Sequence, residues 1–440
     1  MLKKILAIVF SILAIISCSK KTSNTNADAW TEITPDTETT IEVWAWNVAA
    51  NHLKDTISSF NAKYPKIKVN VTEFGGPPAL KQKLFVSLGG NGELPNVVQM
   101  EDIDTPLITE QYHEYFLDLK DQMPDNWSNV VVASKISTSF DSTGKQVTMP
   151  FGIAPAALFY RADLFEKAGI DVNSIVTWED FIEAGKKLQA ALPNTKMVGF
   201  SYTTGFSSFI RAMMLQQDRD YFDQDGKIAI YSKEGIEAAK MMQRLVNEGI
   251  TFDTTDWTGT IRASKTDDIA SIPYGIWWGG TLKDQAPEMK GKWQVTYLPV
   301  LAEGQKRTSI WGGASGGIVN VGDPVKQTAA VEFVKNAMMT IDGQLIAYKQ
   351  YGLIPTYLPT YEDAKFLEED PYFGKGFNEL LGELVNQMPL SAKYTESFPE
   401  AQTLMESAYQ TIINDKADVE KTLQNTAEQL KNSTGVEMAK

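Results

Sequence analysis

Residues 149–171 read MPFGIAPAALFYRADLFEKAGID, and this stretch predicts a crossing between two parts of the chain. It begins as an apolar run that contains Pro150, Gly152 and Pro155, and it continues through the apolar residues 156–160. We interpret the run as an extended strand that leaves one lobe and enters another. A chain of 440 residues suits two such lobes, because single hydrophobic cores seldom grow beyond about 250–300 residues.

Upstream of this crossing, strand and helix patterns alternate. Short apolar runs predict strands at residues 41–46, 67–74 and 96–100. Between them, apolar residues recur at helical spacing over 53–64 and 80–88. An order of strand, helix, strand, helix, strand implies a parallel sheet with right-handed crossovers.

Downstream of the crossing, Thr177 and Asp180 form a capping-box pattern that predicts the start of a helix. The extended apolar run at residues 295–301 predicts a return to the first lobe. A strand at 318–321 and a helix over 325–339 are then expected to complete that lobe.

The N-terminus has the pattern of a secretory signal. Lys3 and Lys4 precede an apolar run over residues 5–16, which is about half of what a membrane-spanning helix needs. Residues 15–18 (IISC) resemble the lipobox of bacterial lipoproteins, in which the cysteine, here Cys18, becomes the lipidated first residue. The alternative is an uncleaved signal-anchor helix in which this cysteine has no role.

The composition excludes several classes of protein. Lys and Arg number 41 against 55 Asp and Glu, a formal net charge of -14, so a nucleic-acid groove is not expected. One Cys and two His exclude disulfide scaffolds, cysteine-rich zinc sites and iron–sulfur clusters. We therefore predict no metal and no cofactor.

Residues 313–317 (GASGG) match the G-x-S-x-G nucleophile elbow of α/β-hydrolases. In that fold the general-base His follows the Ser, and no His follows Ser315 in this chain. We expect instead a glycine-rich turn that brings the backbone close to a ligand or to the other lobe.

The tryptophans are the most informative side chains. Trp46 and Asn47 end the first predicted strand, and ligands of open α/β sheets bind at the carboxyl ends of strands. Trp277 and Trp278 are adjacent, so one of them is expected to face a ligand. Trp311 precedes a glycine pair and is a further candidate. Packing in the core is the alternative for each ring.

Oxygen-bearing side chains follow the third predicted strand. Glu101, Asp102 and Asp104 are candidate acceptors for hydroxyl groups, and the alternative is a solvated acidic turn. A flat ring suits the apolar C–H face of a pyranose, while carboxylates and amides suit its hydroxyls. The aromatic count therefore favours a sugar ligand.

Four stretches resemble the extracellular solute-binding family 1 of bacterial ABC importers, which includes maltose- and oligosaccharide-binding proteins. They are IEVWAWN at 41–47, the crossing at 149–171 followed by TWEDF at 177–181, WGGASGGIVNVGDPVKQTAAVEFVKNAM at 311–338, and GLIPTYLP at 352–359. The resemblance implies the α/β fold of class II periplasmic binding proteins. In this fold two lobes are joined by hinge crossings, and the ligand cleft lies between them.

Carried over residue by residue, the family pattern implies a set of ligand contacts. The implied contacts are Trp46, Asn47, Glu101 and Asp102 from the first lobe, Tyr202, Phe206, Trp277 and Trp278 from the second, and Trp311, Gly313 and Tyr357 near the hinge. One departure is that Tyr160 and Arg161 stand where many members have a Tyr-Asn pair. Arg161 leaves room for a ligand that carries a carboxylate, such as a uronate.

The resemblance also implies a function. We expect a monomeric substrate-binding subunit of an ABC importer, not an enzyme, that delivers an oligosaccharide to transmembrane permease subunits. One alternative is a non-carbohydrate solute such as a polyamine or an organic anion. The other is a secreted glycoside-active enzyme that uses Glu101 and Asp102.

The predicted division of the chain follows from these segments. It consists of a signal peptide at 1–17, a lipid-anchored tether at 18–38, a first lobe at 39–155 plus 300–345, and a second lobe at 156–299 plus 346–440. We expect an exported protein that is anchored to the cell membrane by lipid (palmitate) at Cys18 and faces the periplasm or the cell exterior.

Overall fold

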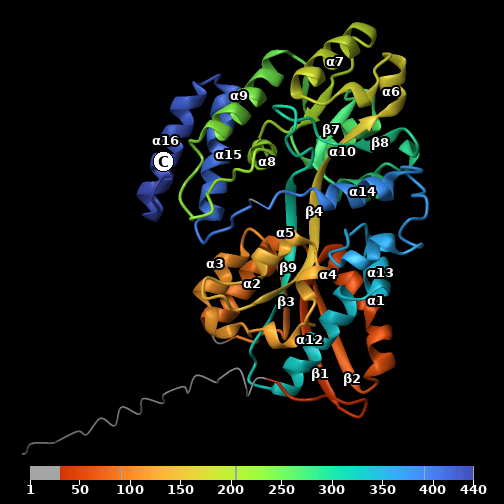
Figure 1. The fold of residues 1–440 in the computed structure, drawn as a ribbon, viewed down its shortest axis with the longest axis vertical. Coiled ribbons are helices and arrows are strands. Elements are labelled where there is room, and N and C mark those ends of the chain that lie inside the picture. Colours follow the sequence, from red (N-terminus) through yellow and green to blue (C-terminus); the bar gives the residue numbers. More distant parts are fainter. Residues whose placement is uncertain (1–29, 91, 204–205, 391, 440) are drawn as a thin grey trace, which may run out of the picture.

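The computed structural model describes residues 30–90, 92–203, 206–390 and 392–439. They form two lobes, and two long strands run from one lobe into the other (Figure 1). The first is β4 (Thr148–Arg161), whose 14 residues extend over about 46 Å at about 3.3 Å per residue. The predicted crossing is therefore strand β4, and the second long strand is β9 (Ile310–Ile318).

The first lobe is built on β1 (Thr39–Trp46), β2 (Ile67–Phe74) and β3 (Val97–Glu101). Strand β1 lies between the other two and pairs parallel with both, which confirms the predicted parallel arrangement. Helices α1 (Asn47–Lys63) and α2 (Pro77–Gly90) connect the strands. The other helices of this lobe are α3 (Thr105–Gln111), α4 (Trp127–Val130), α5 (Ala133–Ile136), α12 (Pro324–Met338) and α13 (Ile341–Tyr351).

Strand β9 differs from its prediction. It pairs antiparallel with β3 and with the lower part of β4, so residues 313–317 lie in a strand and not in a turn. A side chain at Gly316 would collide with the ring of Phe151, and one at Gly317 would collide with the ring of Phe116. The glycines are needed because aromatic rings pack directly on this strand.

The return to the first lobe also lies elsewhere than predicted. Residues 293–296 form β8 (Trp293–Thr296), which pairs with the upper part of β4 inside the second lobe. The predicted return at 295–301 is therefore wrong, since β9 makes that crossing. The predicted strand at 318–321 is wrong as well, because β9 ends at Ile318.

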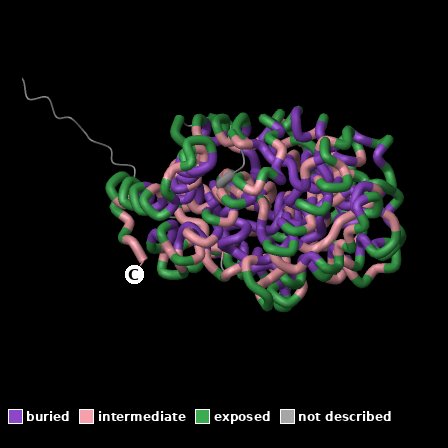
Figure 2. The backbone as a smooth tube through the Cα atoms, turned by 90° about the horizontal axis from the view of Figure 1, so that it is seen from above, coloured by how far each residue is buried: buried purple, intermediate pink, exposed green. Residues whose placement is uncertain are grey.

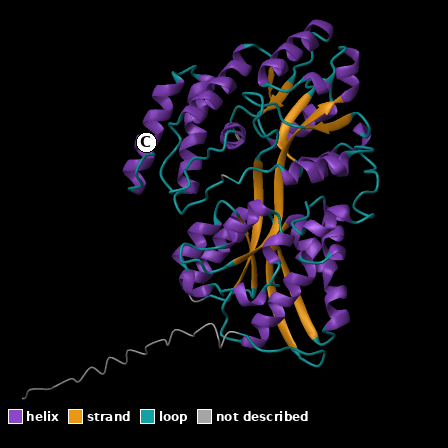
Figure 3. Cartoon of the chain, in the orientation of Figure 1, coloured by secondary structure: helices purple, strands orange, loops and turns teal. Residues whose placement is uncertain are grey.

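The second lobe surrounds the upper part of β4, which pairs with β8 and with β7 (Ser271–Gly275). Strands β5 (Val198–Phe200) and β6 (Thr251–Asp253) form a separate parallel pair. Figure 3 shows helices around these strands. They are α6 (Ala162–Lys167), α7 (Trp178–Ala191), α8 (Phe206–Gln216), α9 (Lys233–Asn247), α10 (Trp257–Lys265), α11 (Trp278–Gln285), α14 (Phe377–Asn386), α15 (Phe398–Asn414) and α16 (Val419–Thr434).

Local signals account for several helix ends. Thr177 accepts a hydrogen bond from the backbone N–H of Asp180, whose carboxylate accepts one from the backbone N–H of Thr177, so the predicted capping box is confirmed. Helix α12 begins after Asp323, whose side chain caps the backbone N–H groups of Val325 and Lys326.

The hydrophobic core includes a cluster in each lobe and another that joins residues of both. Figure 2, which looks along the long axis of the molecule, shows buried backbone through its interior. Fully buried Trp178 and Phe181 belong to a cluster in the second lobe, while Ile41 and Val43 of β1 belong to one in the first. Helix α13 packs on α1 and α12, so we propose to place the last boundary between the lobes after Tyr351.

Candidate functional site

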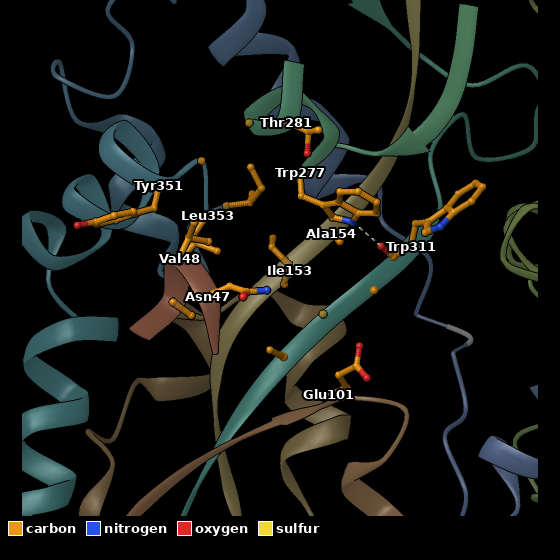
Figure 4. A pocket seen from close by; sticks show the side chains of 18 of the residues that line it. Asn47, Val48, Glu101, Ile153, Ala154, Trp277, Thr281, Trp311, Tyr351 and Leu353 are labelled. Atoms are coloured by element: carbon orange, nitrogen blue, oxygen red, sulfur yellow. Dashed lines mark hydrogen bonds between the residues drawn. The ribbon is translucent and has the colours of Figure 1, made fainter. Parts of the chain in front are cut away.

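A cleft of about 1360 Å³ lies between the lobes and along their connecting strands. Its volume exceeds the roughly 300–1,000 Å³ of a typical small-molecule pocket. Six residues of the predicted site line it, and Figure 4 shows four of them as labelled sticks. The six are Trp46, Asn47, Glu101, Trp277, Trp311 and Gly313.

The end of β1 places Trp46 and Asn47 on the first-lobe wall. The backbone N–H of Trp46 donates to Oε1 of Gln99 on the neighbouring strand β3, 3.1 Å away. Asn47 then starts α1 with a φ of +47°, a left-handed conformation that asparagine tolerates better than most residues. Its exposed amide offers the cleft both hydrogen-bond donors and an acceptor.

Glu101 ends β3 and is half-buried in the cleft. Burial raises the pKa of Glu101 to about 7, the nearby Asp104 carboxylate adds to the increase, and Lys81 opposes it. Lys81 itself binds Asp104 at 2.9 Å, and Glu101 has no ion-pair partner among the described residues. The carboxylate is therefore short of donors, which hydroxyl groups of a ligand can supply.

An aromatic cluster lies at the second-lobe wall. Trp257, Trp277 and Trp311 line the cleft, and Tyr274 packs against Trp277 and Trp311 from outside the lining. Tyr274 stacks on Trp311 at a centroid distance of 5.2 Å, and Trp257 stacks on Trp277 at 5.9 Å. Figure 4 shows the rings of Trp277 and Trp311 in the upper part of the view and Asn47 and Glu101 below them.

A backbone contact holds the cluster in place. The indole Nε1 of Trp277 donates to the carbonyl oxygen of Trp311 at 2.9 Å, so the second lobe is joined to the connecting strand β9 at this point. The indole needs the space beside Gly275, because any side chain at position 275 would collide with it. The rings are thus presented to the cleft in a defined orientation.

Asp102 does not line the cleft, although it follows Glu101 directly. Its carboxylate is buried and forms an ion pair with the buried Lys135, and Ser315 Oγ donates to it at 2.8 Å. Burial lowers the pKa of Lys135, and the charge of Asp102 opposes this change. Gly313, at a φ of +142°, leaves the room that the Asp102 carboxylate occupies. Asp102 therefore supports the wall of the cleft from behind.

Three other predicted contacts lie away from the cleft lining. Trp278 is the first residue of α11 and is completely buried, where it stacks on Tyr274 at 5.3 Å. The hydroxyl of Tyr202 shares a hydrogen bond with that of Thr251 inside the second lobe. Tyr357 lines a separate cavity of about 570 Å³ in the first lobe.

Two predictions concern side chains that lie outside the described residues. The side chain of Phe206, where α8 begins, is one of them, and Cys18 is the other.

Arg161 is accounted for by the fold. Its guanidinium is buried and binds Asp163 at 2.7 Å and Asp267 at 2.8 Å, and it also donates to the backbone carbonyl of Thr266. It is not part of the cleft lining. The departure from the Tyr-Asn pair therefore creates no cationic site for a ligand carboxylate.

Sequence reasoning missed several residues of the cleft lining. Among them are Gln99, Trp257, Lys283, Asp284 and Tyr351. Trp257 is 47 % exposed and stands in a polar stretch without apolar periodicity, so nothing local separates it from a surface residue. Only a weak sequence signal pointed to Tyr351. Gly352 is a typical residue to end a helix, and it does end α13 in the left-handed conformation, so that Tyr351 is the last residue of the helix.

The residues that the structure describes contain no group of three or more His, Cys, Asp or Glu side chains that could hold a metal ion. They also contain no helix that is long and apolar enough to cross a membrane.

Similarity to known proteins agrees with this geometry. Residues 55–375 match the family model described as bacterial extracellular solute-binding protein. A lactose-binding protein of Rhizobium radiobacter is 28 % identical over 76 % of this chain and 79 % of its own. An arabinooligosaccharide-binding protein of Halalkalibacterium halodurans is 23 % identical over 84 % of this chain and 85 % of its own.

Solved structures share the fold. The sugar-binding protein MalE from Xanthomonas citri superposes with a TM-score of 0.78 at 16 % identity, covering 90 % of this chain and 97 % of its own. The ABC transporter associated binding protein from B. animalis subsp. lactis, in complex with beta-1,6-galactobiose, superposes with a TM-score of 0.74 at 22 % identity. The match covers 92 % of this chain and 100 % of the other. With the family model matched over most of its length, this chain belongs to the bacterial extracellular solute-binding proteins.

Proposed function

We propose that this protein is the substrate-binding subunit of an ABC importer and that it captures an oligosaccharide in the cleft between its lobes. The observation that carries this proposal is the pairing of two different walls. An aromatic cluster around Trp277 and Trp311 faces a wall that presents Asn47 and Glu101. Rings and hydrogen-bonding groups together match the two kinds of surface that a sugar presents.

The energetics favour a ligand of more than one sugar unit. Stacking one sugar face of ~40 Å² contributes only ~1 kcal/mol at about 25 cal/mol per Å². Micromolar affinity requires about 8 kcal/mol, so several rings and several hydrogen bonds must act together. A cleft of about 1360 Å³ has room for such a ligand. The relatives named for lactose and arabinooligosaccharides support the same class of ligand.

The proposed mechanism is capture and delivery without chemical change of the ligand. Strands β4 and β9 connect the lobes and form the hinge that lets them close. A ligand that contacts both walls favours the closed state, which the permease then recognises. The predicted acid–base pair of Glu101 and Asp102 is not supported, because Asp102 is engaged by Lys135 behind the cleft wall and only Glu101 of the two lines the cleft.

The remaining parts of the proposal concern export, membrane attachment and oligomeric state. We propose export, lipid attachment at Cys18 and action as a monomer. Acyl chains on this cysteine anchor a protein because each buried methylene contributes ~0.8 kcal/mol. The tether predicted to reach residue 38 is proposed to end before Thr31, because the Thr31 N–H donates to Thr328 Oγ1 at 3.2 Å and Ile33 is buried in the core of the first lobe.

A solute panel tests the proposed function. Differential scanning fluorimetry and titration calorimetry are run with lactose, galactobiose, arabinotriose, maltotriose, spermidine and citrate. A saccharide is expected to raise the melting temperature and to bind at one site, whereas Trp277→Ala weakens binding and the exposed Tyr231→Ala, outside the cleft lining, does not. If only spermidine or citrate gives a heat of binding and a higher melting temperature, the ligand belongs to that class of solute and is not a sugar.

A further inference from the structure

The cleft lining contains three cationic side chains, and each one is already paired. Arg211 binds Asp220 through two hydrogen bonds of 2.8 Å. Lys283 binds Asp370 at 2.6 Å. Both of these carboxylates are buried and lie outside the cleft lining, so they neutralise the cations from behind.

The third cation is Lys349, at the end of the cleft formed by α13. It pairs with Glu368, which also lies outside the lining. Both members of this pair are substantially exposed, so this is the weakest of the three pairings. The described lining therefore presents no cation that is left for a ligand carboxylate.

The carboxylates of the lining show the opposite pattern. Glu73 is paired with Lys54 at 2.9 Å. Glu101 and Asp284 have no ion-pair partner among the described residues, one on each side of the cleft. Asp284 accepts a hydrogen bond only from its neighbour Gln285. Because clefts with low-dielectric walls focus the field of their charges, these two carboxylates act on anything that enters.

We propose that the cleft selects uncharged oligosaccharides and excludes sugars that carry a carboxylate, and that Glu101 is the residue that contributes most to this exclusion. This selectivity rests on the proposed function in sugar capture. Glu101 is the more buried of the two unpaired carboxylates, so solvent screens its charge less than that of Asp284, which is exposed on α11. Above pH 7, where the Glu101 carboxylate is ionised, a uronate bound beside it would place two negative charges in the cleft, and no cation of the described lining is left to compensate them.

The test is a competition for the purified mature protein at pH 8, where the Glu101 carboxylate is ionised. It is incubated with an equimolar pool of xylo-oligosaccharides with and without a glucuronate branch, neutral galacto-, arabino- and malto-oligosaccharides, and galacturonan oligomers. The retained saccharides are identified by native mass spectrometry after buffer exchange. We expect neutral saccharides to exceed uronates at least tenfold relative to the input, and we expect this ratio to fall when the salt concentration is raised.

Three variants and a matched control connect the selectivity to named residues. Glu101→Gln is expected to raise the uronate share at least threefold, and Asp284→Asn by less. Glu368→Gln releases the cation of Lys349 and is also expected to raise it. Glu303→Gln removes the same charge from an exposed site outside the cleft lining and is expected to leave the share unchanged.

Each outcome has a defined meaning. Retention of uronates by the unaltered protein in their input proportion or above overturns the selectivity while leaving sugar capture intact. An equal uronate share in Glu101→Gln and Glu303→Gln overturns the role of Glu101. If Glu101→Gln retains no saccharide, Asp284→Asn and Glu368→Gln decide the role of cleft charge. Retention of no saccharide by the unaltered protein overturns the proposed function, and the selectivity falls with it.

Discussion

The ionised Glu101 carboxylate is available in the cleft at a cost in the stability of the folded protein. Its carboxylate faces the cleft without an ion-pair partner, and burial together with the nearby Asp104 raises its pKa to about 7. Asp102, the next residue, has the opposite surroundings, since Lys135 and Ser315 Oγ satisfy its carboxylate. Two adjacent acidic residues thus serve different purposes, one toward the ligand and one toward the fold.

The first prediction concerns the pH dependence of stability at Glu101. Because its folded pKa lies above the ordinary value of 4.5, the folded state holds the proton more tightly, and its stability falls as the pH rises from 4.5 to about 7. Glu101→Gln is therefore expected to raise the free energy of unfolding by about 1–3 kcal/mol at pH 8 and to change it little at pH 4. Urea unfolding at both pH values measures the difference.

The control for this prediction is Glu303→Gln, an exposed site at which no pH-dependent difference is expected. A Glu101→Gln protein that is less stable than the unaltered one at pH 8 would show that the ionised carboxylate is stabilised by contacts that the structure does not contain.

The second prediction separates two adjacent tryptophans. Trp277 lines the cleft and Trp278 is fully buried, so the same substitution should have different effects. Trp278→Ala is expected to cost about 3–5 kcal/mol of stability because it leaves a large cavity. Trp277→Ala is expected to weaken binding of the tightest saccharide of the panel roughly 5- to 10-fold and to destabilise the protein less. Calorimetric titration and urea unfolding of both variants check this, and equal losses of stability would contradict it.

At the scale of elements, β9 carries more of the architecture than any other strand of the first lobe. It pairs with β3 and with β4, so it joins the parallel part of the sheet to the crossing strand. It also supplies Trp311 and Gly313 to the cleft lining. Glycine is required at positions 316 and 317 because rings of Phe151 and Phe116 cover this strand closely.

The third prediction follows from that packing. Gly316→Ala places a methyl group where the ring of Phe151 already lies, and overpacking of this kind typically costs about 1–3 kcal/mol. Gly152→Ala on the neighbouring strand β4 is the matched control, because nothing lies within 4 Å of the added methyl group. The midpoint of urea unfolding is expected to fall for Gly316→Ala and to stay within experimental error for Gly152→Ala. Equal midpoints would show that the Phe151 ring moves aside without cost.

At the scale of the whole molecule, the extended backbone of β4 and β9 connects the two lobes. A core cluster lies in each lobe, and another joins residues of both, among them Tyr348 and Trp278. Rotation about such a connection leaves the clusters within each lobe intact. The walls of the cleft lie on both sides of it, with Asn47 and Glu101 in one lobe and Trp277 in the other. A ligand that contacts both walls therefore favours the state in which they are closest.

The fourth prediction concerns this closure. Small-angle scattering of the protein with the tightest saccharide of the panel is expected to give a smaller radius of gyration than without it. Saturation at 100 times Kd is expected to stabilise the protein by about 2.7 kcal/mol. For Trp277→Ala at the same saccharide concentration, both the decrease in radius of gyration and the gain in stability are expected to be smaller. Binding by calorimetry with an unchanged radius of gyration would contradict closure and leave binding itself established.

Some helix ends could be predicted from the sequence because residues next to them in the chain determine where the helix begins or ends. The capping residues Thr177 and Asp180 act within one helical turn, and so does the stop at Pro65 after α1, so neither needs the rest of the protein. The alternation of strands and helices likewise specified the parallel order around β1, and the carboxyl end of that strand pointed to Trp46 and Asn47.

Long-range packing was required for the rest. The segment 313–317 is a strand and not a turn because it pairs with the distant strands β3 and β4, and its last two glycines make room for the rings of Phe151 and Phe116. Glu101 and Asp102 differ because Lys135, 33 residues further along the chain than Asp102, is buried against only one of them. Trp257 joins the aromatic cluster only once the second lobe has folded around β7. A pattern within the chain encodes contacts over a turn or a strand pair, whereas burial, charge pairing and the two walls of a cleft arise between segments that meet only in the folded protein.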